Sequence, residues 1–151
     1  GGCGGCGCGA GCGFGEGGWL RVGVVLCGVG SGVVVVHLVL IKASRRRQIV
    51  RLVAYIQREI PDNAPLIVSG DFNDWGLASA AALKAYHLQA FKANPITAKR
   101  LYTFPSRLPL VQFDYVYARH LTPTHAHAPQ GRHWARMSDH LPLIADFVMA
   151  K

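Results

Sequence analysis

The pattern of hydrophobic and polar positions predicts two strands and a helix in the first part of the chain. Valine dominates residues 19–41, and the sequence GVGSG divides this stretch, which predicts strands at about 20–26 and 33–41. Apolar residues then recur at spacings of four, three and four residues, which predicts a helix with one apolar stripe formed by Ile49, Val53, Ile56 and Ile60. Ser44 is the expected N-terminal cap of this helix, and Pro61 is expected to end it.

Shorter elements follow in the second part. The pattern predicts buried strands at Leu66–Val68, Phe113–Ala118 and Leu143–Val148, and an alanine-rich helix at Leu77–His87. Residues 92–112 are expected to be irregular. Residues 119–137, rich in His, Pro and Arg, are expected to form a long loop. The order of strands and helices predicts an α/β or α+β layered domain.

Composition divides the chain into two parts. Fifteen of the 18 glycines and all five cysteines lie at or before Gly32. We therefore expect residues 1–18 to be disordered and residues 19–151 to form the folded domain. Cys3, Cys6, Cys8 and Cys12 could supply four zinc ligands, but the folded loop that usually separates two cysteine pairs is absent, so zinc is not favoured.

The chain is basic, with a formal net charge of +8. An anionic partner such as nucleic acid or phosphate would explain the charge, and so would a need for solubility alone. The charge-free apolar run at 22–36 is too short for a membrane span, which takes roughly 18 or more residues. The first residues carry no secretory signal, which predicts a cytoplasmic protein.

Polar side chains stand at the ends of several predicted strands, or within them, where packing alone would not place them. These residues are His37, Asp71, Asn73, Asp114, Asp139 and His140. Taken singly, His37 could be a core histidine, and Asp71 and Asn73 could be turn formers. Asp114 stands within a strand and needs a partner, for which His140 is the natural candidate. Together they predict a site where strand ends meet.

Four motifs resemble those of the endonuclease/exonuclease/phosphatase superfamily. They are GDFND at 70–74, FDYVY at 113–117, SDHLPL at 138–143, and HL at 37–38 followed by RRRQ. TFPS at 103–106 also fits the pattern of this superfamily. GDFNDW at 70–75 together with TFPS resembles a bacterial subgroup of small members. The resemblance covers roughly residues 33–149 and, more weakly, the hairpin from about residue 19. It implies the C-terminal half of a four-layer α/β sandwich, with one mixed sheet and flanking helices.

The resemblance also implies a reaction, which is hydrolysis of a phosphodiester or phosphomonoester with Mg²⁺ (or Mn²⁺). Asp71 would orient or deprotonate the attacking water, Asn73 would help to position that water and the phosphate, and Asp114 would orient His140. His140 and His37 would contact the phosphate, and Asp139 would lie beside the metal. The expected substrate carries phosphate, as nucleic acid, phospholipid head group or sugar phosphate, and no stable protein partner is predicted.

Two motifs of the superfamily are missing from the chain. In the superfamily, the first half of a complete domain supplies a strand ending in Asn and a strand ending in Glu, and this Glu is the main metal ligand. This chain has only two glutamates, Glu16 and Glu59, and neither fits that motif. We therefore expect an incomplete metal site and a truncated or mis-started chain that is weakly active or inactive. The alternative function is that of a non-catalytic fragment that binds phosphate or nucleic acid.

Overall fold

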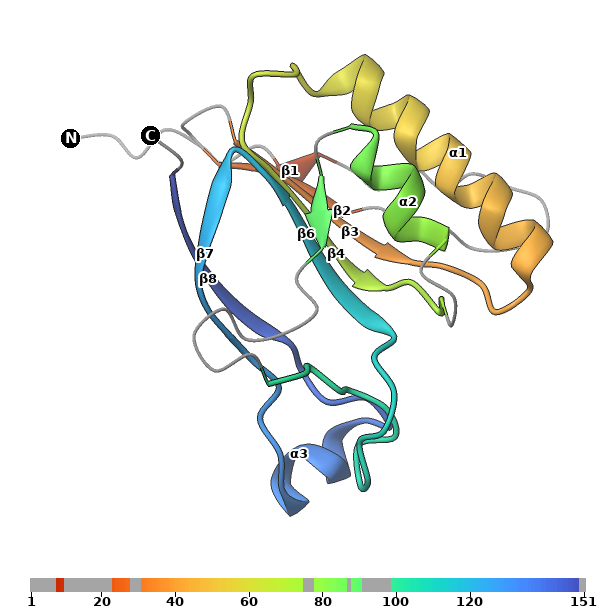
Figure 1. The fold of residues 1–151 in the computed structure, drawn as a ribbon, viewed down its shortest axis with the longest axis vertical. Helices are drawn as coiled ribbons and strands as arrows, with labels where there is room; N and C mark the ends of the chain where they lie inside the picture. The colour runs from red at the N-terminus through yellow and green to blue at the C-terminus, as the bar shows by residue number, and fades with distance from the viewer. Residues whose placement is uncertain are drawn as a thin grey trace.

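The computed structural model describes residues 8–9, 23–27, 31–74, 78–86, 88–90 and 99–149. Their elements form two sheets (Figure 1). The larger sheet has six strands in the order β1-β2-β3-β4-β6-β5, and the smaller pairs β7 with β8. The strands of the larger sheet are β1 (Cys8–Gly9), β2 (Gly23–Cys27), β3 (Ser31–His37), β4 (Leu66–Asp71), β5 (Gln89–Ala90) and β6 (Asp114–Arg119). It is a mixed sheet, since β3 and β4 are parallel and the other pairs antiparallel.

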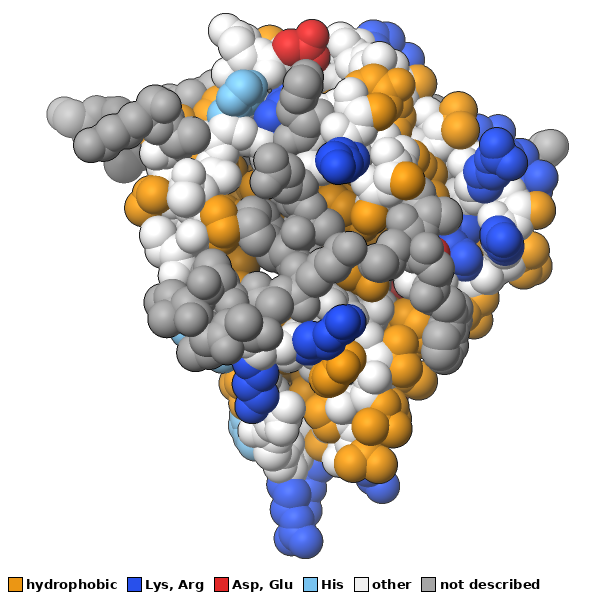
Figure 2. All heavy atoms as spheres, viewed as in Figure 1, with side chains coloured by type: hydrophobic (Ala, Val, Ile, Leu, Met, Phe, Trp, Pro, Cys, Tyr) orange, Lys and Arg blue, Asp and Glu red, His pale blue; other side chains and the backbone are white. Residues whose placement is uncertain are grey.

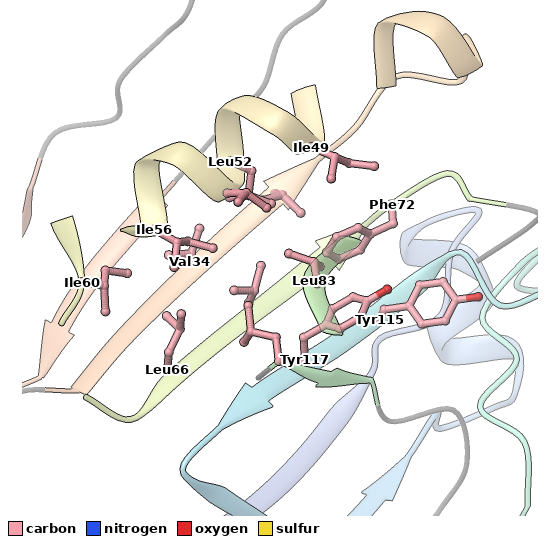
Figure 3. Packing of buried hydrophobic residues seen from close by; sticks show 14 of the residues in the cluster. Val34, Ile49, Leu52, Ile56, Ile60, Leu66, Phe72, Leu83, Tyr115 and Tyr117 are labelled. Atoms are coloured by element: carbon pink, nitrogen blue, oxygen red, sulfur yellow. The ribbon is translucent and has the colours of Figure 1, made fainter. Parts of the chain in front are cut away.

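Two helices cover one face of the larger sheet, as Figure 1 shows: α1 (Lys42–Glu59) and α2 (Ala78–Lys84). The apolar stripe of α1 turns inward, so that Ile49, Leu52 and Ile56 are buried. They join a core that also contains Val34 and Leu66 from the sheet (Figure 3). The predicted mixed sheet with flanking helices is therefore confirmed, and the core lies between the sheet and the helices.

The start of α1 differs from the prediction. The helix begins at Lys42 with Ile41 as its N-cap and no side-chain cap, so the expectation that Ser44 caps it is wrong. Ser44 lies in the first turn, where its hydroxyl accepts a hydrogen bond from Arg47. The preceding loop is instead held by buried polar groups of the helix, because Arg45 donates to the Leu40 carbonyl at 2.7 Å. The helix ends before Pro61, as predicted.

Residues 119–137 are more ordered than predicted. They contain strand β7 (Leu121–His127), which pairs with β8 (Ile144–Met149), and helix α3 (Arg132–Met137). The prediction of a loop is wrong, because Pro123 and the many polar residues of this segment are untypical of a strand. The pairing of β7 with β8 has an irregularity between Pro123 and His125. The short strand β5 was also not predicted.

Other predictions fall partly outside the described residues. The two residues Cys8–Gly9 pair with β2, which differs from the disorder expected there, and the rest of residues 1–18 lie outside the described part. Cys3, Cys6 and Cys12, three of the four cysteines considered as zinc ligands, also lie outside the described residues. Among the described residues, no helix is both long enough and apolar enough to cross a membrane.

Candidate active site

Three polar side chains lie in one row across adjacent strands of the larger sheet. His37 at the end of β3 is paired with Asp71 at the end of β4, and Asp71 is paired with Asp114 at the start of β6. Register partners share a face of the sheet, so the three side chains are neighbours. The distance between His37 Nε2 and Asp71 Oδ2 is 3.6 Å. The side chain of His37 is 68% exposed, so the interpretation of His37 as a core histidine is wrong.

The backbone around Asp71 has an unusual conformation that fixes this carboxylate. Gly70 has a φ of 133°, and Asn73 has a φ of 47°. A side chain at Gly70 would collide with the carbonyl oxygen of Val36 on the neighbouring strand. The backbone N–H of Asn73 donates to Asp71 Oδ1 at 2.8 Å, which closes a turn of the kind that Asx residues form.

The Asn73 side chain is buried and its amide group is engaged. Its Nδ2 donates to the Leu38 carbonyl at 2.8 Å and to Asp71 Oδ2 at 3.1 Å. Both oxygens of Asp71 therefore accept hydrogen bonds from one residue. Asp71 and Asn73 are therefore turn formers and also members of the site, because the turn that they form orients the Asp71 carboxylate.

His140 completes the cluster from a distant part of the chain. Its Nδ1 is 2.7 Å from Asp114 Oδ2, as the need of Asp114 for a partner predicts. Its other ring nitrogen, Nε2, is 3.9 Å from Asp71 Oδ2. A carboxylate on one nitrogen fixes the ring and leaves the other nitrogen directed toward the site.

The loop that carries His140 is fixed by a second loop. The Ser106 N–H donates to the Asp139 carbonyl at 2.7 Å, and Leu141 N–H donates to the Thr103 carbonyl at 2.8 Å. The Phe104 ring lies against the His140 imidazole with 5.0 Å between centroids. The TFPS motif at 103–106 therefore positions His140, a role that its residue types alone did not indicate.

Burial and neighbouring charges shift two pKa values in the site. Burial raises the pKa of Asp71, the hydrogen bond from Asn73 opposes this, and the nearby Asp114 carboxylate raises it further; the pKa ends above its usual range. Burial by itself would lower the pKa of His140, but the hydrogen bond and charge of Asp114 outweigh it and raise the pKa overall. The site therefore favours an imidazolium beside a carboxylate that holds a proton more readily than usual.

Asp139 differs from the other predicted site residues in its surroundings. It is exposed, and its carboxylate accepts a long hydrogen bond of 3.4 Å from the Ser138 hydroxyl. Across the described ranges, no group of three or more His, Cys, Asp or Glu side chains is arranged to hold a metal ion. The residues described here do not by themselves fit a Mg²⁺ centre, and Asp139 is a single candidate ligand.

Sequence reasoning assigned no role to two buried polar residues beside the site. Asp74, in the GDFND motif, accepts a hydrogen bond from the Ser79 N–H at the start of α2. Gln48, in the RRRQ motif, accepts one from the Val39 N–H in the loop after β3. Both residues lie in the motifs quoted above, and this was the signal that could have identified them.

The fold and the site define a class of protein: the chain belongs to the Endonuclease/Exonuclease/phosphatase family, whose pattern it matches over residues 4–140. Among curated proteins, it is 33% identical over 131 residues to the uncharacterized protein YbhP of Escherichia coli strain K12. The match covers 85% of this chain and 50% of YbhP, so the chain spans about half the length of this relative.

Solved structures share the fold at lower identity. The mannosyl-6-phosphatase Bt3783 of Bacteroides thetaiotaomicron aligns with a TM-score of 0.62 at 16% identity, over 87% of this chain and 57% of that protein. D. rerio TDP2, complexed with a single-strand DNA product, aligns with a TM-score of 0.58 at 18% identity, over 87% of this chain and 62% of that chain.

Proposed function

We propose that this chain carries the water-activating and phosphate-contacting side of a phosphoester hydrolase that cleaves a phosphodiester or a phosphomonoester. The observation that supports the proposal most is the series Asp114–His140–Asp71, in which one imidazole lies between two carboxylates of adjacent strands. One structural neighbour is a mannosyl-6-phosphatase, and another was solved in complex with a single-strand DNA product. The proposal therefore includes both phosphomonoesters and phosphodiesters as substrates.

Each residue has a role that follows from its contacts. Asp71 accepts the proton of the attacking water, and its raised pKa makes it a stronger base than an ordinary carboxylate. Asn73 holds Asp71, because its amide donates to that carboxylate and to the Leu38 carbonyl. That Asn73 also helps to position the water and the phosphate stays an expectation.

His140 acts on the phosphate in the proposed mechanism. Asp114 accepts from Nδ1 and favours the charged ring, so that Nε2 donates to a phosphate oxygen as negative charge develops there. His37, exposed beside Asp71, is placed to contact the same group. Phosphoryl transfer depends mainly on such positioning and charge stabilisation.

Magnesium (or manganese) stays a prediction of the family resemblance, with Asp139 as its one ligand among the described residues. A bound divalent ion supplies charge stabilisation of several kcal/mol in such sites. Because the described residues form no group that could hold a metal ion, we expect this chain alone to hydrolyse phosphoesters slowly. The same observation favours the second candidate function, a fragment that binds phosphate or nucleic acid without cleaving it.

The test measures hydrolysis and binding on the same proteins. Bis-p-nitrophenyl phosphate and p-nitrophenyl phosphate are incubated with Mg²⁺ and the chain, its Asp71→Asn and His140→Gln variants, and the control Asp62→Asn. The Asp62 side chain is 98% exposed at the turn after α1 and pairs with Arg119 at 3.5 Å. Slow turnover that is lost in both site variants and kept in the control supports the hydrolase.

Full-length YbhP serves as the comparison protein, since this chain matches half of its length. Phosphate binding without turnover by the short chain, together with turnover by YbhP, supports the non-catalytic fragment. Turnover that persists in Asp71→Asn contradicts the roles given above.

A further inference from the structure

A cavity of about 490 Å³ lies between the loop after Ser106 and the residues around α3. Arg107, Arg132 and Arg136 line it together with Ser106 and Gln130, and its described lining contains no Asp or Glu. We call it the arginine pocket. Figure 2 shows Lys and Arg side chains at the lower tip of the molecule, where Figure 1 places α3.

One residue of the arginine pocket, Ser106, contacts the loop that carries His140. Ser106 lines the pocket, and its N–H and hydroxyl donate to the carbonyls of Asp139 and Ser138, each at 2.7 Å. These two residues directly precede His140. A ligand in the pocket therefore lies next to the loop that presents the imidazole.

The three arginines of the pocket differ from the three described arginines that form ion pairs. Arg45, Arg58 and Arg119 each have a carboxylate within 4.0 Å. Within the described part of the chain, no such ion pair involves Arg107, Arg132 or Arg136. Their side chains are exposed around a cavity, and the planar guanidinium group binds phosphate oxygens through two parallel hydrogen bonds.

A second cavity extends this basic surface. It has a volume of about 350 Å³, shares Gln130 with the arginine pocket, and is lined by Lys99 and Arg100 among others. Cationic side chains therefore continue from the loop of His140 past Gln130. An anionic ligand longer than one phosphate fits this arrangement better than an isolated ion does.

We propose that the arginine pocket binds a second phosphate of the substrate whose first phosphate is hydrolysed beside His140. The inference rests on the proposed function and narrows it, since the substrate then carries at least two phosphates. These could be the two groups of a small bisphosphate or successive phosphates of a nucleic acid strand, and the test separates the two sources.

The test is a binding measurement on the full chain carrying Asp71→Asn, so that hydrolysis does not interfere. The probes are phenyl phosphate, thymidine 3′,5′-bisphosphate and a single-stranded thymidine tetranucleotide, titrated by calorimetry at two salt concentrations. Arg132→Gln/Arg136→Gln is compared with Arg46→Gln/Arg51→Gln, which removes the same charge from α1, where these two arginines line a separate cavity. Circular dichroism checks that both proteins are folded.

We expect the pocket variant to weaken binding of a two-phosphate probe about tenfold and to leave phenyl phosphate unchanged. The dependence of log affinity on log salt should flatten by about one for each arginine that no longer binds a phosphate. If the pocket variant binds both the bisphosphate and the tetranucleotide more weakly, a small bisphosphate is enough to occupy both sites. If only the tetranucleotide binds more weakly, the substrate is a nucleic acid strand.

Equal losses of affinity in the pocket and α1 variants would overturn the inference, because the binding would then not depend on the arginine pocket in particular. So would an equal loss of affinity for phenyl phosphate, or failure of both longer probes to bind. The proposed function has its own readout, which is hydrolysis that depends on Asp71, so the two can fail separately.

Discussion

Replacing Gly70 with alanine should destabilise this protein more than the same change at Gly32 or Gly131. Gly70 has a φ of 133°, and an ideal Cβ there would lie 1.9 Å from the carbonyl oxygen of Val36. Real Cβ atoms essentially never show contacts under 3.0 Å. Strands β3 and β4 must therefore separate by about 1 Å at this point, in an interior packed too densely to yield easily.

The size of the effect follows from two contributions. A non-glycine residue in this backbone region costs about 1–3 kcal/mol. The clash with the Val36 backbone adds to this cost, so we expect Gly70→Ala to lower the free energy of unfolding by at least about 4 kcal/mol. That is a large part of the roughly 5–15 kcal/mol by which domains are stable.

Two other glycines provide matched controls. Gly131 has a φ of 117° but no atom within 4 Å of its ideal Cβ, so Gly131→Ala should show the backbone cost alone. Gly32 has no positive φ, and its Cβ would meet the end of the Leu66 side chain at 3.3 Å, so Gly32→Ala should change stability by less than about 1 kcal/mol.

The assay is urea unfolding of the wild-type protein and the three variants, followed by circular dichroism. The expected order of stability loss is Gly70→Ala, then Gly131→Ala, then Gly32→Ala. A loss for Gly70→Ala within about 1 kcal/mol of that for Gly131→Ala would refute the reasoning, because the contact between β3 and β4 would then add nothing.

Asp114→Asn should lower the pKa of His140, measured by NMR titration of the ring, because the variant removes the charge that favours imidazolium; an unchanged pKa would contradict the 2.7 Å contact. The raised pKa of His140 also makes stability depend on pH: its contribution is fully present below the unfolded value of 6.5 and is lost as pH rises through the folded pKa. The free energy of unfolding should therefore fall from pH 6.5 upward more in the wild-type protein than in His140→Gln, and parallel profiles would count against this. Leu52→Ala should cost about 2–5 kcal/mol because the Leu52 side chain is fully buried. Val50→Ala, on the exposed side of the same helix, should cost less than about 0.5 kcal/mol, and equal unfolding midpoints for these two variants would disprove the orientation of α1.

The sequence predicted the parts of the fold in which one periodic signal dominates. The stripe from Ile49 to Ile60 defined α1, and the apolar run at Leu66 defined β4, because burial on one face leaves a regular spacing. It failed for β7, where Pro123 and His125 break the alternation and the partner strand β8 provides the pairing. Long-range pairing of this kind leaves no local signal.

The site was predicted at the level of which residues meet, and less well at the level of what each one does. Polar residues at strand ends pointed to Asp71, Asp114 and His140, because a buried carboxylate needs a partner. That Asn73 uses its amide to hold Asp71 depends on a positive φ and on the Leu38 carbonyl, 35 residues away. The support of His140 by Ser106 depends on a contact between loops that no spacing rule describes.

The alignment of His37, Asp71 and Asp114 at the same level of three strands has a consequence for how this chain tolerates change. Side chains alternate between the two faces of a strand, so deleting one residue inside β4 or β6 would send its carboxylate to the helix side of the sheet. Lengthening the turn after α1 or the segment before β6 would leave the row intact. Insertions and deletions inside these strands should therefore disrupt the row of side chains, whatever residue is added or removed. The turn after α1 should tolerate them, whereas the loops at 103–106 and 138–141, whose contacts position His140, should not.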